Sequence, residues 1–186
     1  INAYGDLGEF YRSTDIIYIA SPHQTHYEYI KKSLEHGKHV LCEKPMCLSK
    51  SQAEELFDCA ARKNLVLFEG IKTAYCPGFS KLLGIACSGM IGEIRAIDAC
   101  FTKLENESRR ELKDRVYGGS FTEMGSYCLL PVLKLFGHDY QQIRFDSIAN
   151  EKGIDIYTRA HMGYPNGMAT VTCGLGVKSE GKLMLS

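Results

Sequence analysis

The stretch HVLCEKP, residues 39–45, decides the fold of this chain. The apolar run 39–42 is typical of a strand, and the charged pair Glu43 and Lys44 follows it directly, before Pro45. Open α/β sheets present their chemistry at the carboxyl ends of strands. Proline fixes its own φ, and an X-Pro bond is one of the few that can be cis, so Lys44 is held in one direction. A plain surface turn is the alternative, and the flanking sequence decides between the two.

Strands and helices alternate on both sides of this stretch. Residues 15–20 form an apolar run rich in β-branched side chains, which is typical of a strand buried on both faces. Gly37 is placed to end one helix, and Ser49 with Gln52 forms a capping box that begins another. The expected elements are strands over 15–20, 39–42 and 65–68, and helices over 25–35 and from Ser49 onward. Such alternation predicts parallel strands joined by right-handed crossovers, the second half of a Rossmann-type doubly wound sheet.

The pattern changes after Ile71. Pro77 begins a helix that we expect to end at Gly89, and a second helix is expected over 120–136. Strands are expected over 93–103, 142–148, 154–162, 168–174 and 182–185, with a hairpin turn at Pro165-Asn166-Gly167. This pattern predicts an α+β domain with a mainly antiparallel open sheet. We therefore expect two domains, residues 1–73 and 74–186.

Composition excludes several classes of protein. The chain is 45% hydrophobic and 24% charged, with a net charge of zero, so a basic nucleic-acid surface is not indicated. No apolar run reaches the length of a membrane span, and no leader opens the chain, although a leader could have been removed. The eight cysteines include no C-x-x-C pair, which favours reduced thiols and a cytoplasmic location.

Four motifs stand out, at residues 15–22 with His26, 37–45, 88–94 and 118–127. In sequence and order they resemble those of the Gfo/Idh/MocA family of NAD(P)-dependent oxidoreductases. The family's usual Asp and His, four residues apart in the last motif, are here Glu123 and Tyr127. Spacing of four keeps both on one helical face, and the tyrosine resembles the branch of dimeric dihydrodiol dehydrogenase and xylose dehydrogenase. The resemblance implies that 1–73 is a partial NAD(P)-binding domain and 74–186 a partial substrate-binding and oligomerisation domain.

One family feature is missing. Nothing in the chain matches the glycine-rich G-x-G-x-x-G fingerprint, and residues 4–8 have the wrong spacing. The family places that fingerprint, and the residue that distinguishes NAD from NADP, before the position of Ile1. Its sheet also continues beyond the position of Ser186. We therefore expect an internal fragment of a longer parent, which by itself could be inactive.

The resemblance implies hydride transfer between NAD or NADP and a CH–OH or C=O group of a sugar, polyol or related diol. Tyr127 would exchange the substrate hydroxyl proton. A tyrosine normally titrates near about 10, and the ammonium of Lys44 would favour the phenolate while orienting substrate and nicotinamide. Glu123 would anchor the substrate or hold Lys44. Without the motif, Tyr127 would be interpreted as a core tyrosine.

Further site residues follow from their positions at strand ends. The expected cofactor-binding residues are Ala20, Ser21, Pro22, His26, Glu43, Lys44 and Pro45. The expected substrate-binding residues are Lys72, Lys103 and Glu123, whereas Arg109 and Arg110 are more simply interpreted as solvated charges. A locally bonded histidine is an equal alternative for His26. His23 and His26 lack a third ligand, so no metal site is expected.

The sequence leaves other functions of the same fold open. Relatives include glycosidases that oxidise the sugar only transiently, and regulators that bind the cofactor without turnover. A regulator would tolerate loss of Lys44 and Tyr127, and both are present. The expected partners are a small sugar-like or polyol-like substrate and a second copy, a homo-oligomer formed through the C-terminal sheet, with no nucleic acid and no membrane.

Overall fold

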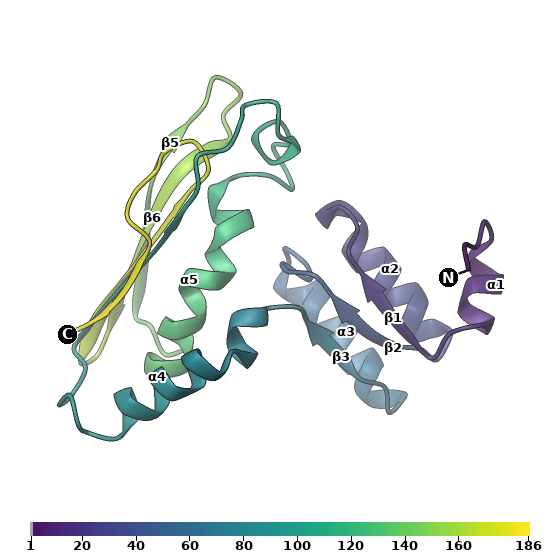
Figure 1. Ribbon diagram of the computed structural model, residues 1–186, viewed down its shortest axis with the longest axis horizontal. Coiled ribbons are helices and arrows are strands. Elements are labelled where there is room, and N and C mark those ends of the chain that lie inside the picture. The colour runs from purple at the N-terminus through teal and green to yellow at the C-terminus, as the bar shows by residue number, and fades with distance from the viewer. Residues whose placement is uncertain (1) are drawn as a thin grey trace. The chain divides into compact units, whose positions relative to one another are not determined.

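A computed structural model describes residues 2–186; Ile1, the first residue of the expected 1–73 domain, lies outside the described residues. The chain forms two compact units, one ending at Gly70 and the other running from Ile71 to Ser186 (Figure 1). The expected boundary followed residue 73. Within the described part of the chain, no helix is both long enough and apolar enough to cross a lipid bilayer.

The first unit contains a parallel sheet of three strands. These are β1 (Ile16–Ile19), β2 (His39–Cys42) and β3 (Leu67–Glu69), in the order β1-β2-β3. The helices α2 (His23–Glu35) and α3 (Lys50–Arg62) connect them, as the alternating pattern predicted. Parallel strands need such crossovers, because a short turn can join only antiparallel neighbours. The expected parallel α/β fold is confirmed.

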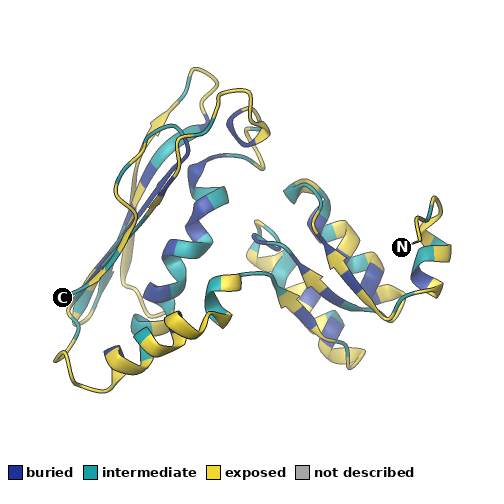
Figure 2. Ribbon diagram, in the orientation of Figure 1, coloured by how far each residue is buried: buried dark blue, intermediate teal, exposed yellow. Residues whose placement is uncertain are grey.

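The helices α2 and α3 cover one face of this sheet. Their buried residues share a core with alternate strand residues, including Ile17, Ile19 and Val40. The alternate residues Tyr18, Leu41 and Phe68 are paired in register and are 57%, 38% and 55% exposed (Figure 2). The expectation that strand 15–20 is buried on both faces is therefore wrong for the described chain, because both helices pack on the same side.

The helix ends in this unit match the sequence patterns only in part. Gly37 has a φ of 72° just after α2, as expected of a residue that ends a helix. Ser49 is the N-cap of α3, but its side chain makes no capping bond and its Oγ lies 2.8 Å from Oγ of Ser51. The expected capping box is therefore wrong. A short helix that the patterns did not predict, α1 (Leu7–Arg12), is capped by Asp6.

The second unit contains the remaining elements. The helical ones are η1 (Lys72–Tyr75), α4 (Pro77–Cys87), η2 (Arg110–Leu112) and α5 (Ser120–Phe136). The strands are β4 (Ala96–Thr102), β5 (Gln142–Ala149), β6 (Asp155–Tyr164), β7 (Gly167–Gly174) and β8 (Lys182–Leu185). Pro77 opens α4 as predicted, and α5 has the expected bounds.

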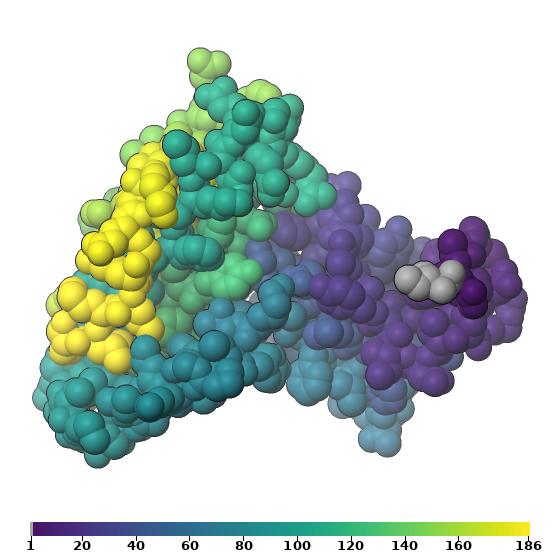
Figure 3. Space-filling view, viewed as in Figure 1, coloured from purple at the N-terminus to yellow at the C-terminus, as the bar shows by residue number. Residues whose placement is uncertain are grey.

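These five strands form one mixed sheet in the order β5-β6-β7-β4-β8. The expected hairpin joins β6 to β7, with Tyr164 paired to Gly167 across Pro165 and Asn166. Every pairing is antiparallel except that of β4 with β7, which is parallel. β8 is an edge strand, and Figure 3 shows the C-terminal residues, in yellow, on the outside of this unit. The prediction of a mainly antiparallel sheet is confirmed.

Helix α5 packs on one face of this sheet. Met124, Cys128 and Val132 on the helix join Ala160 and Val171 on the strands in a buried core (Figure 2). Residues of the opposite face include charged pairs, such as Arg144 and Asp146, and the exposed apolar side chains Ile148, Met168 and Met184. Glu123 and Tyr127 therefore lie on the helix that forms the core of this domain with the sheet.

Candidate active site

The carboxyl ends of β1, β2 and β3 are joined by main-chain hydrogen bonds. The N–H of Glu43 donates to the carbonyl of Ile19 at 2.8 Å, and that of Gly70 donates to the carbonyl of Cys42 at 2.6 Å. A Cβ at Gly70 would lie 3.2 Å from that carbonyl oxygen, so a glycine lets the backbones approach closely. The strand ends therefore form one continuous edge, as the fold predicts for a ligand-binding crevice.

Carboxylates at this edge are held by nearby donors. Tyr18 donates its hydroxyl to Oε1 of Glu43 at 2.6 Å, and the N–H of Met46 donates to Oε1 of Glu69 at 2.9 Å. Burial raises the pKa of Cys42 to about 12, and the charges of Glu69 and Glu43 add to this effect. The Cys42 thiol is therefore protonated at neutral pH and is not a nucleophile.

Lys44 is only 7% exposed, and its peptide bond to Pro45 is cis. Lysine is almost never buried unless its charge is paired or used. The residues expected to bind the cofactor surround it in sequence. Ala20 is exposed, whereas Ser21, Pro22, Glu43 and Pro45 are half-buried. Their exposure leaves them accessible to a ligand at the strand ends, and their role in cofactor binding stays a prediction.

His26 is fully buried and connects two of the strand-end loops. Its Nδ1 lies 2.9 Å from the carbonyl oxygen of Pro45, and its Nε2 lies 2.9 Å from that of Ser21. Each ring nitrogen thus faces a main-chain carbonyl oxygen, and the N–H of a neutral ring donates to one of the two. Any effect of His26 on a cofactor passes through those two loops. His23 and His26 are not joined by a further ligand, and the residues described contain no group of three His, Cys, Asp or Glu able to hold a metal ion.

In the second unit, the start of α5 is fixed by two glycines and a distant carboxylate. Gly119 has a φ of 98°, and a Cβ there would overlap the carboxylate of Asp155. A Cβ at Gly118 would overlap main-chain oxygens of the preceding loop. Asp155 accepts the N–H of Phe121 at 2.9 Å, and its carbonyl accepts the Ser120 hydroxyl at 3.0 Å. This acceptor satisfies a free N–H at the positive end of the helix that carries Glu123.

Glu123 and Tyr127 are both half-buried and lie one turn apart on α5. The ring of Tyr127 packs edge-on against Phe101 of β4, with centroids 5.3 Å apart. This contact places the tyrosine beside the carboxyl end of β4. Of the expected substrate residues, Lys103 follows the same strand, whereas Lys72 is exposed in η1.

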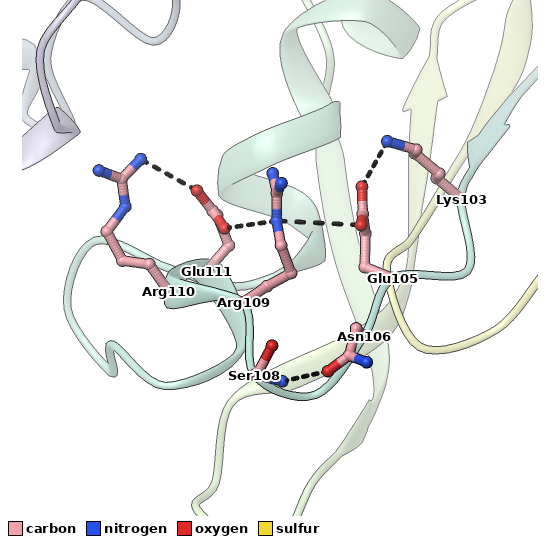
Figure 4. Close-up of polar contacts among 7 residues, drawn as sticks. All are labelled: Lys103, Glu105, Asn106, Ser108, Arg109, Arg110 and Glu111. Carbon is pink, nitrogen blue, oxygen red and sulfur yellow. Dashed lines mark hydrogen bonds and ion pairs between the residues drawn. The ribbon is translucent and has the colours of Figure 1, made fainter.

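A charged cluster follows β4, at residues 103–111 (Figure 4). Lys103 Nζ lies 2.5 Å from Oε1 of Glu105. Arg109 Nε lies 3.2 Å from Oε2 of Glu111 and 3.9 Å from Oε2 of Glu105. Arg110 lies 3.0 Å from the other oxygen of Glu111. The arginines, interpreted from sequence as solvated, are about half-exposed but are held by these carboxylates.

A recess of about 90 Å³ lies against this cluster. Its lining comprises Lys103, Glu105, Arg109, Glu111, Glu123, Met124 and Leu175. The structure therefore brings together Lys103 and Glu123, two of the three residues expected to bind substrate. Glu105 and Glu111 were not predicted, because their contacts depend on the loop conformation and no periodic pattern marks them.

Glu105 and Glu111 beside the recess are ionised at neutral pH. The hydrogen bond from Lys103, followed by the charge of Arg109, holds the pKa of Glu105 below its usual value. Burial acts to raise the pKa of Glu111, but hydrogen bonds from its own N–H and from Arg110 and the charge of Arg109 outweigh it and lower the pKa. Both side chains therefore present negative charge.

Comparison with known proteins finds a family model that matches the first part of the chain. Residues 1–71 match the model of an oxidoreductase family with an NAD-binding Rossmann fold. Over these residues the chain is similar to the Gfo/Idh/MocA oxidoreductase family. The similarity of individual Gfo/Idh/MocA relatives continues into the second unit, which the family model does not cover.

Two curated relatives illustrate this. The chain is 30% identical over 164 residues to scyllo-inositol 2-dehydrogenase (NADP+) of Bacillus subtilis, covering 83% of this chain and 49% of that protein. It is 28% identical over 188 residues to trans-1,2-dihydrobenzene-1,2-diol dehydrogenase of Bos taurus, and the match covers 99% of this chain and 56% of that protein. The solved structure of the probable oxidoreductase yhhX matches with a TM-score of 0.82 at 26% identity. The match covers 98% of this chain and 54% of that protein. The chain spans about half the length of the curated relatives it matches.

A Gfo/Idh/MocA oxidoreductase implies a nicotinamide dinucleotide, and the residues present fit part of it. The strand-end edge carries a buried ammonium on Lys44 and half-buried polar side chains on Ser21 and Glu43. These groups suit the polar ring substituent and ribose at the nicotinamide end. A glycine-rich segment suited to the pyrophosphate is not found in residues 2–186.

Proposed function

We propose that the protein transfers a hydride between a nicotinamide cofactor, NAD or NADP, and a CH–OH or C=O group of a sugar, polyol or related diol. The similarity of both units to relatives named as inositol and dihydrodiol dehydrogenases carries this proposal. The bound cofactor would supply the hydride acceptor or donor. The relatives reported above are dehydrogenases or oxidoreductases by name, so a glycosidase or a cofactor-sensing regulator is not favoured.

The proposal assigns each site residue a task. Tyr127 exchanges the proton of the substrate hydroxyl, because a phenol can both donate and accept that proton. Lys44 orients the reacting C–O group through its ammonium. Glu123 accepts a hydrogen bond from a second substrate hydroxyl, in the recess that it shares with Lys103. Lys72 contributes a further substrate contact.

We assign one task to each domain and place the cofactor pocket in the first. Residues 1–73 bind the cofactor and 74–186 bind the substrate. The loops after β1 and β2, with Ala20, Ser21, Pro22, Glu43, Lys44 and Pro45, form the wall around the nicotinamide. His26 supports that wall through the carbonyls of Ser21 and Pro45.

Variants of Lys44 and Tyr127 in the full-length protein test the function. Reduction of NAD+ or NADP+ with scyllo-inositol or D-xylose is followed by absorbance. Lys44→Met and Tyr127→Phe should each lower kcat roughly 10²–10⁴-fold, the usual contribution of acid–base groups. Lys50→Met, at a side chain 88% exposed, and Tyr140→Phe are matched controls that should stay near wild type. Turnover within a few-fold of wild type for both site variants would overturn the assignment.

We also propose that a second copy of the chain packs on the open face of the second sheet. Ile148, Met168 and Met184 on that face are 54%, 65% and 46% exposed, and such apolar side chains favour association. Ile148→Asp with Met168→Asp should halve the mass measured by light scattering. An unchanged mass would place the contact elsewhere.

A cytoplasmic location is proposed as well. All eight cysteines are free, including buried Cys42, Cys128 and Cys173, and a reducing compartment keeps thiols in that state. Fractionation of cells expressing a tagged full-length protein tests the location. Recovery of the tag outside the cytoplasmic fraction would contradict it.

A further inference from the structure

Glu105 forms ion pairs with both cations that line the recess beside Glu123. Its Oε1 lies 2.5 Å from Lys103 Nζ, and its Oε2 lies 3.9 Å from Arg109 Nε (Figure 4). The Glu105 side chain is only 14% exposed, whereas those of Lys103 and Arg109 are 61% and 51% exposed. The carboxylate is thus the inner partner of the cluster, and the cations reach outward from it.

Both cations of the recess lining already have carboxylate partners without a ligand. Lys103 and Arg109 face the carboxylates of Glu105, Glu111 and Glu123. A ligand carboxylate or phosphate entering here would meet carboxylates whose cations are already engaged. A hydroxyl has one donor and accepts as well, so it can bond a carboxylate oxygen and a spare N–H of Lys103 or Arg109 together. The recess therefore suits an uncharged hydroxyl group.

We propose that Glu105 determines substrate specificity by excluding anionic substrates, so that the recess takes a neutral hydroxyl-bearing part of the substrate. This deepens the proposed function and rests on it for the identity of the ligand. Specificity of this kind comes from a repulsive element as much as from an attractive one. Removing the Glu105 charge should free Lys103, whereas Glu111 still holds Arg109 at 3.2 Å. Charge-assisted bonds from a freed cation to a ligand carboxylate are among the stronger hydrogen bonds.

Binding of D-glucose and D-glucuronate to the full-length protein tests the proposal. The two sugars differ only in a CH₂OH or a carboxylate group, and saturation-transfer NMR detects weak binding of either without turnover. Glu105→Gln keeps the shape of the side chain and removes its charge. The affinity for glucuronate relative to glucose should rise about tenfold or more in this variant, as expected for one new charged contact.

Glu93→Gln is the matched control. Glu93 and Glu105 each pair with a cation two residues away, Arg95 at 2.7 Å and Lys103 at 2.5 Å. They flank opposite ends of β4 (Ala96–Thr102), so the control removes the same charge away from the recess. It should leave the ratio of affinities unchanged. Adding Lys103→Met to Glu105→Gln should reverse the gain.

Three results would overturn the proposal. The first is that folded Glu105→Gln shows the wild-type ratio of affinities for glucuronate and glucose, or does not bind glucuronate. The second is that Glu93→Gln gains as much affinity for glucuronate, relative to glucose, as Glu105→Gln does. The third is that the wild-type protein binds glucuronate as well as it binds glucose. Circular dichroism verifies that each variant is folded; if Glu105→Gln is not, Glu105→Ser is used with the same criteria. Because binding is read without cofactor, a failed hydride-transfer assay would refute the proposed function separately.

Discussion

Nδ1 of His26 lies 2.9 Å from the carbonyl oxygen of Pro45, the residue that follows Lys44. The opposite ring nitrogen lies 2.9 Å from the carbonyl oxygen of Ser21. One buried ring thus joins the loops after two neighbouring parallel strands. The position of the backbone next to Lys44 depends on this ring.

Replacing His26 should destabilise the first unit. His26→Ala removes a fully buried ring and takes the partner away from two carbonyls, so we expect a loss of about 2–4 kcal/mol in the free energy of unfolding. Urea unfolding measures it. His26→Gln keeps an N–H donor and should lose less. His138→Ala, at an exposed histidine, should change stability by less than about 0.5 kcal/mol. Equal stability of His26→Ala and wild type would contradict this role.

Gly119 should tolerate no side chain. Gly119→Ala places a Cβ against the Asp155 carboxylate at a φ of 98°, so we expect a loss of about 2 kcal/mol or more. A Cβ at Gly84 in α4 would meet no heavy atom within 4 Å outside its own helix, and Gly84→Ala should stabilise by about 0.4–1 kcal/mol. Thermal unfolding compares the two. Similar shifts of Tm in both variants would show that the α5 start is not constrained as described.

Acid should weaken the loop that contains Glu111. The pKa of Glu111 is lowered in the folded protein, since its hydrogen bonds and Arg109 outweigh burial. The folded pKa lies below the unfolded value, so the stabilisation is present above about pH 4.3 and is lost as pH falls through the folded pKa. The free energy of unfolding should therefore fall less steeply with acid in Glu111→Gln than in wild type. Parallel pH curves would contradict this.

Two cysteines should react before the rest. Cys76 and Cys87 are exposed, whereas Cys42 is buried with its pKa raised to about 12 by burial and by Glu69 and Glu43. Thiolates are the reactive form, so brief treatment with iodoacetamide should label Cys76 and Cys87 first. Peptide mass spectrometry gives the order. Cys76→Ser with Cys87→Ser should remove the fast phase, and early labelling of Cys42 in folded protein would be inconsistent with its environment.

Local patterns predicted most of the elements. Helix 120–136 and the hairpin at Pro165-Asn166-Gly167 match the structure, because apolar periodicity and turn residues act over a few positions. The order of strands and helices also predicted a parallel sheet. The resemblance of the motifs to the family predicted Lys44, Glu123 and Tyr127 as site residues, and this assignment stays a prediction.

Long-range contacts were not predictable in the same way. Asp155 caps α5 from β6, so no pattern near the helix start marks it. The carbonyl partners of His26 are main-chain atoms, which carry no sequence signal. Glu105 lies in the loop after β4 and Glu111 in the short η2, where charge alone is usually interpreted as solvated. The exposed face of the first sheet depends on which side α2 and α3 occupy.

The parallel pairing of β4 with β7 has a consequence for synthesis. Ala96 pairs with Met168, so 72 residues, 168 minus 96, separate the partners. At about 5–20 residues per second, β4 would leave the ribosome roughly 4–14 s before β7 is made. Its partner β8 comes later still. A nascent chain stalled before residue 168 should therefore expose β4 to protease and lose that sensitivity once β7 and β8 emerge; resistance in the shorter chain would contradict this order.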